Sequence, residues 1–323
     1  MNNKRTEARR KKDPLVNFKI GEILTVADVY TLFMIALYSV FLIIFYQSTK
    51  DVTDYLFLNA LIAFWIISIG TINSKYEAGR LFLLFQRLAI VPIIFYIYML
   101  THIILPKMNP KILDGFFIQL DQYIFGFNPT EWIYQFSSPV LTEILQIFYW
   151  LFFFLIFING IELHINKKDR QFRDFASMIM FSFYLTYILY IIFPVIGPRF
   201  TLHDFFMLDQ ELPGLFFTEL IREQINAGAG LTGTEADPAA IVNRDCMPSG
   251  HTALSIINTF LAFKFSTRFR WFILIVSIGI IFSTIYLRYH YAIDVIAGIA
   301  TALFILIFEP QLRAIIKKIK DKY

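Results

Sequence analysis

Three groups of polar residues, far apart in the chain, carry side chains that suit phosphate chemistry. They are Arg199, the run Ser249-Gly250-His251, and the pair His290 and Asp294. An arginine and the free N–H groups of a helix start both bind anions, and a glycine lets an anion approach the backbone closely. A histidine and an aspartate four residues apart share one helical face. The carboxylate can therefore hold one ring nitrogen and leave the other free to attack.

This pattern predicts a role for each side chain. His290 is the expected nucleophile, Asp294 orients it, and His251 is the acid that protonates the leaving oxygen. Arg199 and Arg288 are the expected clamps on the phosphate oxygens, because a guanidinium offers forked donors. Ser249 and Gly250 complete the predicted phosphate site at the start of a helix.

Two histidines and a carboxylate could instead hold a metal ion. The arginines beside them favour an anion, so we expect no metal and no cofactor. Cys246, the only cysteine, stands next to the second group. We interpret it as a small neighbour of a functional turn and not as a nucleophile, because no base at a short offset would activate the thiol.

Membrane helices must position these groups. Of 323 residues, 57% are hydrophobic and 17% are charged, whereas about 25% are charged in soluble domains. Apolar runs close to the ~20 residues that cross a bilayer predict an all-α, polytopic membrane helix bundle with about eight transmembrane helices. The runs are residues 26–46, 55–72, 83–105, 141–161, 175–198, 249–266, 271–288 and 292–309.

The predicted organisation is one membrane domain, residues 26–309, between basic tails at residues 1–25 and 310–323. Residues 106–140 mix aromatic and polar side chains, which predicts short interfacial helices on the outer side. Residues 199–247 form the longest connection, and this length is typical of a lid or a binding element.

Lysine and arginine indicate the orientation of the domain. Most of the 29 Lys and Arg residues fall in the two tails and in the loops that would share their side of the membrane. By the positive-inside rule, both termini are expected on the cytoplasmic side of the membrane. We expect this membrane to be a bacterial-type plasma membrane. All three polar groups then lie at the outer ends of helices, on the extracytoplasmic side.

The polar groups resemble the three motifs of the type 2 phosphatidic acid phosphatase superfamily, whose general forms are KxxxxxxRP, PSGH and SRxxxxxHxxxD. The likeness covers about residues 120–309 and includes PSGH at residues 248–251 and HYAID at residues 290–294. The resemblance implies a lipid phosphatase, or a related phosphotransferase, that works without a metal through a phosphohistidine intermediate. It also implies the roles given above for Arg199, the PSGH run, His290 and Asp294.

The chain departs from these motifs at three positions. Ile192 replaces the lysine of the first motif, Phe200 replaces the proline, and Thr284 replaces the arginine of the third motif. Arg288 is the nearest substitute for that arginine. The PSGHT and HYAID strings are also similar to those of the inositol phosphorylceramide and sphingomyelin synthases, which transfer a phospho-headgroup to an alcohol.

Hydrolysis of a lipid phosphate or diphosphate at the outer leaflet is our leading interpretation. Transfer of a phospho-headgroup to an alcohol acceptor is the alternative, since both reactions share the chemistry up to the intermediate. A non-catalytic lipid transporter or binding protein is a third reading, although a transporter typically has broken helices near the midplane. The expected partners are a lipid phosphate substrate and membrane lipids, not nucleic acid; the lipid tail and the oligomeric state are left open.

Overall fold

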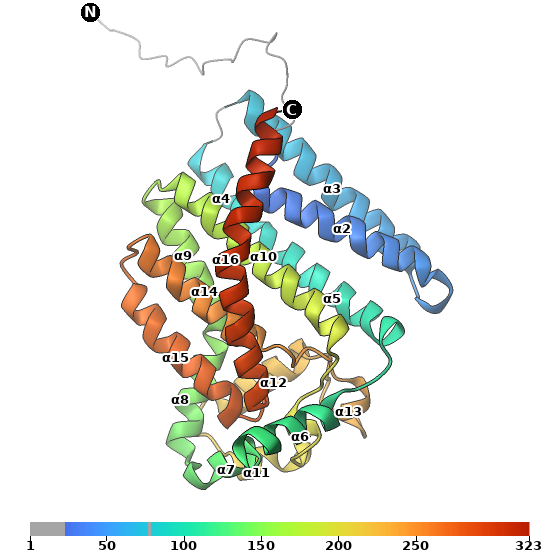
Figure 1. The fold of residues 1–323 in the computed structure, drawn as a ribbon, viewed down its shortest axis with the longest axis vertical. Coiled ribbons are helices and arrows are strands. Elements are labelled where there is room, and N and C mark those ends of the chain that lie inside the picture. The colour runs from blue at the N-terminus through green and yellow to red at the C-terminus, as the bar shows by residue number, and fades with distance from the viewer. Residues whose placement is uncertain (1–22, 77–78, 323) are drawn as a thin grey trace, which may run out of the picture. The chain divides into compact units, whose positions relative to one another are not determined.

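The computed structural model describes residues 23–76 and 79–322. Within these residues the regular structure consists of helices and has no strand, which confirms the all-α expectation (Figure 1). The basic N-terminal tail predicted from the sequence lies outside the described residues, apart from residues 23–25. The basic residues after position 310 continue the last helix as far as Lys322.

The chain divides into two compact units. The first comprises Met1–Leu100 and Pro310–Tyr323. Its helices are α2 (Val26–Ile44), α3 (Val52–Lys75), α4 (Arg80–Leu88), most of α5 (Ile90–Met108) and the end of α16 (Ala292–Lys322). Polar contacts join three of them, because Asn59 of α3 donates to Ser39 of α2 at 2.8 Å and accepts from Tyr96 of α5 at 2.8 Å.

The second unit, Thr101–Glu309, contains all the predicted site residues. Its longer helices are α6 (Asp114–Phe125), α8 (Pro139–Trp150), α9 (Phe152–Ile165), α10 (Asp169–Ile192), α12 (Thr218–Gly228), α14 (Gly250–Lys264), α15 (Arg270–Tyr286) and the start of α16. Helices α7 (Pro129–Trp132), α11 (Leu208–Glu211) and α13 (Pro238–Ile241) are single turns. Helix α14 packs against α9, α10 and α15, and α15 packs against α8.

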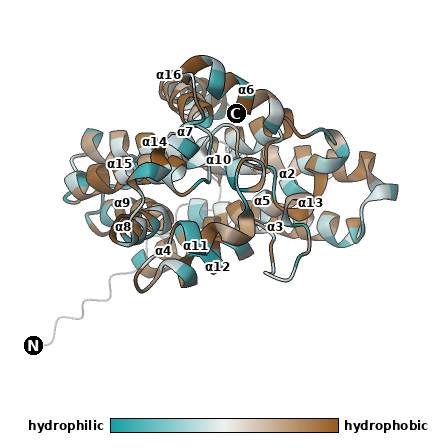
Figure 2. Cartoon of the chain, turned by 90° about the horizontal axis from the view of Figure 1, so that it is seen from below, coloured by the Kyte–Doolittle hydropathy of each residue, from teal (hydrophilic) through white to brown (hydrophobic). Residues whose placement is uncertain are grey.

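Each apolar run predicted to cross the membrane overlaps a helix, and hydrophobic residues follow these helices in Figure 2. The count of eight spans is not confirmed. Among the described residues, five helices are long and apolar enough, or six if α8 and α9, which meet at 45°, form one broken span. Helices α14 and α15 have 15 and 17 residues. At 1.5 Å per residue they reach roughly 23 and 26 Å, short of the ~30 Å hydrocarbon core.

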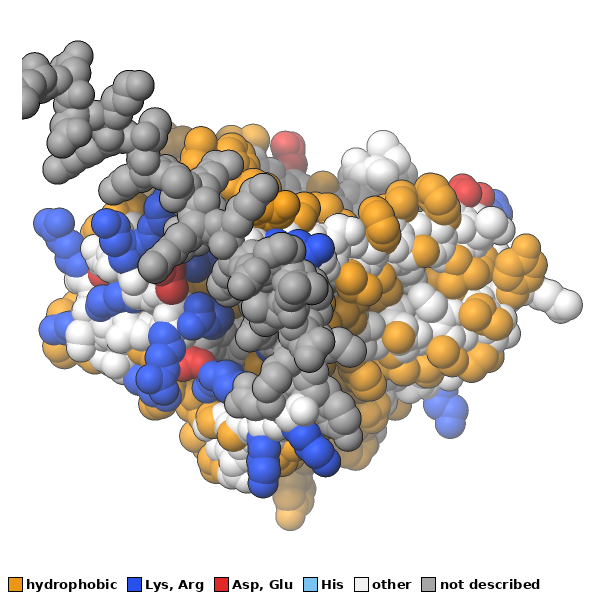
Figure 3. All heavy atoms as spheres, turned by 90° about the horizontal axis from the view of Figure 1, so that it is seen from above, with side chains coloured by type: hydrophobic (Ala, Val, Ile, Leu, Met, Phe, Trp, Pro, Cys, Tyr) orange, Lys and Arg blue, Asp and Glu red, His pale blue; other side chains and the backbone are white. Residues whose placement is uncertain are grey.

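Basic side chains gather on the face of the molecule seen in Figure 3. In the second unit, the α9–α10 and α14–α15 turns both carry Lys and Arg residues. These turns lie side by side, because Lys168 donates through Nζ to the carbonyl oxygen of Phe265 at 3.0 Å. The opposite end of α14 is its start at Gly250, where the short helices α6, α7, α11, α12 and α13 lie in Figure 1.

Candidate active site

The fold brings the three polar groups of the sequence together. The backbone N–H of Arg199 donates to the carbonyl oxygen of Arg288 at 3.1 Å, and that of Ser249 donates to the carbonyl oxygen of Asp294 at 3.0 Å. The ring centroids of His251 and His290 are 5.9 Å apart. Helix starts and turns from distant parts of the chain therefore meet at one site.

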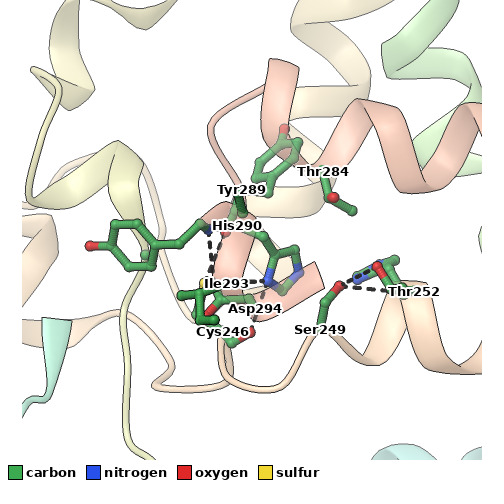
Figure 4. A network of polar contacts seen from close by, with 12 residues as sticks. Cys246, Ser249, Thr252, Thr284, Tyr289, His290, Ile293 and Asp294 are labelled. Atoms are coloured by element: carbon green, nitrogen blue, oxygen red, sulfur yellow. Dashed lines mark hydrogen bonds and ion pairs between the residues drawn. The ribbon is translucent and has the colours of Figure 1, made fainter. Parts of the chain in front are cut away.

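The ring of His290 is held through its Nδ1 atom. Nδ1 lies 2.8 Å from the carbonyl oxygen of Cys246 and 3.5 Å from Oδ2 of Asp294. A carbonyl oxygen can only accept, so Nδ1 carries the proton and Nε2 has the free lone pair. Figure 4 shows the His290 ring between Cys246 on one side and Ser249 on the other. The sequence pointed to Asp294 but gave no sign of the closer acceptor, a backbone oxygen.

Asp294 is fully buried at the start of α16. Its Oδ2 atom accepts from the backbone N–H of Tyr291 at 2.9 Å and from the thiol of Cys246 at 3.0 Å. Its Oδ1 atom has no hydrogen-bond partner among the described residues. Hydrogen bonds to Oδ2 thus fix the carboxylate, whereas Oδ1 can still accept a hydrogen bond.

Helix α14 begins at the Ser249-Gly250-His251 run. The hydroxyl oxygen of Ser249 caps the helix by accepting from the N–H of Thr252 at 3.3 Å. It also accepts from the hydroxyl of Thr252 at 3.0 Å, so the Ser249 proton is free to donate to an anion. A Cβ atom at Gly250 would come within 2.5 Å of the hydroxyl oxygen of Tyr190. A larger residue here would have to displace the Tyr190 hydroxyl, so glycine gives the closest packing.

Aromatic rings fix the position of His251. Its ring stacks on Tyr149 at a centroid distance of 4.3 Å and lies 4.5 Å from the ring of Phe152. Tyr149 in turn stacks on Tyr289 at 4.4 Å. The hydroxyl oxygen of Tyr149 is 3.4 Å from Nδ1 of His251. These aromatic residues were not singled out from the sequence, because similar residues occur throughout the membrane helices.

Arg199 lies in a 3-10 turn, Pro198–Phe200, and is buried. Its Nη1 atom donates to Oδ1 of Asn226 in α12 at 2.7 Å. The guanidinium carbon lies 4.9 Å from the ring centroid of Tyr289 and 4.6 Å from that of Phe200. Phe200, which stands where the related motif has proline, thus provides a cation–π contact to the arginine.

Two carboxylates of α6 hold the backbone around the site. Asp114 accepts from the backbone N–H groups of Ile196 and Gly197 at 3.0 and 2.9 Å, just before Arg199. Asp121 accepts from the N–H groups of Ala292 and Ile293 at 3.0 and 2.8 Å, at the start of α16. An acidic side chain at a helix N-terminus is stabilising. The sequence had placed these aspartates in an interfacial segment without assigning them a function.

Arg288 contacts residues 199–247, which are called the outer connection here because the sequence predicts them on the outer side. Its backbone is in the left-handed region, with φ 64°. Its guanidinium forms an ion pair with Glu211 of α11 and lies 5.1 Å from the ring centroid of Tyr134. The hydroxyl of Thr284, which stands at the third-motif arginine position, donates to the carbonyl oxygen of Ile281 at 2.7 Å. To bind phosphate, the Arg288 guanidinium would therefore have to accept a second anion beside Glu211 or to break its ion pair with Glu211.

The outer connection, residues 199–247, is anchored to α8 through Glu143. The Glu143 carboxylate accepts at 2.7 to 3.3 Å from the backbone N–H groups of Leu215, Phe216, Phe217 and Thr218. The hydroxyl of Thr218 also donates to it, at 2.7 Å. Helix α12 begins at Thr218, so one buried carboxylate satisfies N–H groups that a helix start leaves unpaired.

Replacing Glu143 by alanine is expected to release α12 from α8. Each buried N–H group left without an acceptor costs about 1–3 kcal/mol, so opening of the outer connection should increase at least about tenfold. Limited proteolysis of residues 199–247 in detergent measures this. Glu131→Ala is the matched control, because Glu131 is exposed and its side chain accepts from Asn128 at 2.8 Å. Equal cleavage rates in the two variants would contradict the anchoring role.

The described helices indicate a membrane protein, because at least five of them are long and apolar enough to cross a bilayer. Residues 117–308 match the model of the PAP2 superfamily, and the chain belongs to this superfamily. Membership confirms the resemblance seen in the sequence and indicates a phosphatase-type enzyme.

One curated relative is a PA-phosphatase related-family protein of Dictyostelium discoideum. It is 27% identical over 193 residues, an alignment that covers 54% of this chain and 33% of the relative. The chain thus matches about a third of the length of that relative. No solved structure matches the chain.

Proposed function

We propose that this protein is an integral membrane lipid phosphatase that hydrolyses a lipid phosphate or diphosphate through a phosphohistidine on His290. The observation that carries the proposal is the hydrogen bond from Nδ1 of His290 to the carbonyl oxygen of Cys246, 2.8 Å long. It holds the proton on Nδ1 and leaves the lone pair of Nε2 for phosphorus. The ring of His251, 5.9 Å away, is close enough for both histidines to act on one phosphate group.

In the first step, Nε2 of His290 forms a bond to phosphorus while the bond from phosphorus to the lipid oxygen breaks. His251 gives its proton to that leaving oxygen. In the second step, His251 takes a proton from water, the water oxygen binds phosphorus, and the phosphorus–nitrogen bond breaks. Phosphate leaves and His290 regains its lone pair.

The phosphate oxygens need donors throughout both steps. Arg199, the hydroxyl of Ser249 and the backbone N–H groups from Gly250 onward are the proposed donors at the start of α14, and Arg288 is the proposed further donor. Donors that are already oriented stabilise transition-state charge without reorganisation. The buried hydrogen bonds of Arg199 and Ser249 support such preorganisation.

The site is proposed to face the extracytoplasmic side, with both termini in the cytoplasm. In the second unit the basic turns lie at the end of α14 and the site lies at its start, which supports this orientation. A membrane-impermeant phosphate ester offered to intact cells tests it. Hydrolysis without permeabilisation is expected, and activity that appears only after permeabilisation would reverse the orientation.

Transfer to an alcohol acceptor is the second candidate, and burial of three of the site residues favours it. Arg199 is 5% exposed, His290 4% and Asp294 0%. A site closed to water protects an intermediate from hydrolysis, which suits transfer to a bound alcohol.

A panel of lipid phosphates distinguishes these functions. Purified protein is incubated with each lipid, with and without inositol or another alcohol acceptor, and the products are identified by mass. Release of inorganic phosphate without an acceptor supports hydrolysis, whereas a new phosphodiester that requires the alcohol supports transfer. Absence of any product across the panel would favour the non-catalytic transporter or binding protein.

Activity is expected to survive exhaustive chelation within about twofold. The proposed catalytic atoms are held by protein groups, namely the carbonyl of Cys246, the cap of Ser249 and the side chain of Asn226. The assay compares turnover before and after dialysis against a strong chelator. Loss of turnover that a divalent ion restores would instead assign the histidines and Asp294 to a catalytic metal site.

A further inference from the structure

A second set of ligand atoms lies on the far side of the His290 ring from the proposed phosphate site. Sγ of Cys246 lies 3.0 Å from Oδ2 of Asp294 and 3.3 Å from Nδ1 of His290. Nδ1 and Oδ2 are 3.5 Å apart, and all three residues are buried (Figure 4). A sulfur, an imidazole nitrogen and a carboxylate oxygen thus form a compact triangle.

The triangle has the dimensions of a tetrahedral metal site. Zinc bonds are about 2.3 Å to sulfur and 2.0–2.2 Å to nitrogen and oxygen, so neighbouring ligand atoms in a tetrahedron lie about 3.3–3.6 Å apart. The sulfur–oxygen separation would need to grow by about half an ångström, and the other two by about 0.2–0.3 Å or less. The carbonyl oxygen of Tyr289, 3.1 Å from the sulfur, is available as a fourth ligand.

Asp294 supplies an independent sign that a group is accommodated here. Its side chain is 0% exposed, yet Oδ1 has no partner among the described residues. A buried carboxylate oxygen normally has a hydrogen bond or an ion. The triangle is formed with Oδ2, so a cation that Asp294 binds through both carboxylate oxygens would also give Oδ1 a partner.

The charge on this side of His290 also favours a cation. The carboxyl groups of Asp294, Asp114 and Asp245 all lie close enough to interact electrostatically with the Cys246 thiol. The neutral thiol donates to Asp294 when the site is empty. A divalent cation that displaces the thiol proton would balance one thiolate and one carboxylate, so the loaded site would have no net charge.

We propose that a thiophilic divalent cation such as Zn²⁺ or Cd²⁺ binds Cys246, His290 and Asp294 and inhibits the enzyme. The ligand set excludes Mg²⁺ and Ca²⁺, which prefer oxygen ligands. The inhibition rests on the proposed function. A cation on Nδ1 moves the proton of the neutral imidazole to Nε2, so the atom that must attack phosphorus loses its lone pair. The thiol proton passes to solvent, and no oxidation or reduction occurs.

Cobalt reports occupation of the site without any assay of activity. Cys246 is the only cysteine, so a thiolate-to-cobalt charge-transfer band can arise only from this residue. Co²⁺ added to the purified full-length protein is expected to give this band with one ion per chain, and Zn²⁺ should abolish it by competition. Cys246→Ser and Cys246→Ala should both lack the band. Absence of the band in the wild-type protein overturns the proposed site.

Inhibition is measured separately, with each variant compared with its own activity in chelator. Zn²⁺ is expected to inhibit the wild-type protein at concentrations at least tenfold lower than those needed for Cys246→Ser or Cys246→Ala. His102→Gln is the control for a competing site, because His102 lies 3.8 Å from Asp245, and it should keep wild-type sensitivity.

The two proposals can fail separately. A cobalt band together with full activity in saturating Zn²⁺ overturns the inhibition and leaves the phosphatase intact. Lack of turnover in metal-free buffer, with a normal cobalt band, counts against the proposed function and not against the metal site. Equal Zn²⁺ sensitivity of the wild-type protein and both Cys246 variants would also overturn inhibition through this site.

Discussion

Replacing His290 by alanine is expected to abolish trapping of labelled phosphate on the protein and to lower turnover on the order of 10⁴-fold or more. Removal of a nucleophile stops the pathway, and the residual rate comes only from the remaining binding groups. The measurement is quenching in detergent at alkaline pH after brief exposure to labelled substrate, followed by gel analysis of protein-bound label at the same pH. The bond to histidine should be acid-labile and stable in base, which distinguishes it from a phosphoserine on Ser249.

His251→Ala is the matched comparison, because the two histidine rings are only 5.9 Å apart. Loss of a general acid commonly costs 10²- to 10⁴-fold when the leaving oxygen needs a proton. With an activated leaving group such as nitrophenolate, the first step needs no acid, so His251→Ala should still form the labelled adduct. Adduct formation in His290→Ala, or no difference between the two leaving groups in His251→Ala, would contradict the assigned roles.

Removal of the Arg288 guanidinium is expected to lower turnover about a hundredfold. Loss of one preorganised donor to a transition state costs on the order of 3 kcal/mol. Arg288 is the proposed substitute for the third-motif arginine, since Thr284 bonds within its own helix. Arg288→Lys keeps the positive charge but loses the forked donors of the guanidinium, so its turnover should lie between those of Arg288→Ala and the wild-type protein. Initial rates of folded, purified variants measure the effect.

Glu211→Gln separates a phosphate role for Arg288 from a purely structural one. The ion pair between Arg288 and Glu211 joins the third motif to α11 of the outer connection. If the guanidinium binds phosphate, Glu211→Gln should retain most of the activity, because loss of the Glu211 charge frees the Arg288 guanidinium to donate to phosphate. Equal losses in Arg288→Ala and Glu211→Gln would indicate that the pair only anchors the connection.

Turnover of Arg288→Ala within about twofold of wild type would move the search for a further donor elsewhere. Arg244 and the outer connection are the next candidates. The guanidinium of Arg244 donates to the carbonyl oxygens of Asn109 and Pro110 at 3.4 and 3.2 Å, so it too would need to change partners.

The sequence by itself determined the helical class, the approximate positions of the apolar helices and the motifs that mark the superfamily. Apolar runs and helix-start signals are local properties, so they can be recognised in a sequence without knowledge of how the helices pack. The 249–251 run was predicted to open a helix, and α14 does begin at Gly250 with Ser249 as its cap. The closeness of the motifs followed from counting helices across a membrane and agrees with the short separation of His251 and His290.

Local sequence patterns did not determine the number of membrane-spanning helices. A hydropathy run shows that a segment avoids water, but it does not show where a helix bends or ends. Helices α8 and α9 meet at 45°, and α14 stops after 15 residues. These features depend on how the helices pack, which the run lengths do not encode.

Only the tertiary structure decided which groups hold the candidate site in place. Nδ1 of His290 donates to a backbone oxygen, Asp114 and Asp121 hold backbone N–H groups of two distant segments, and Glu143 holds the start of α12. Nearly every residue has a backbone donor and acceptor, so no side-chain pattern marks the ones that will be used. The partners are selected when helices far apart in the chain pack together and water is excluded, because a buried polar group must then find its bond within the protein.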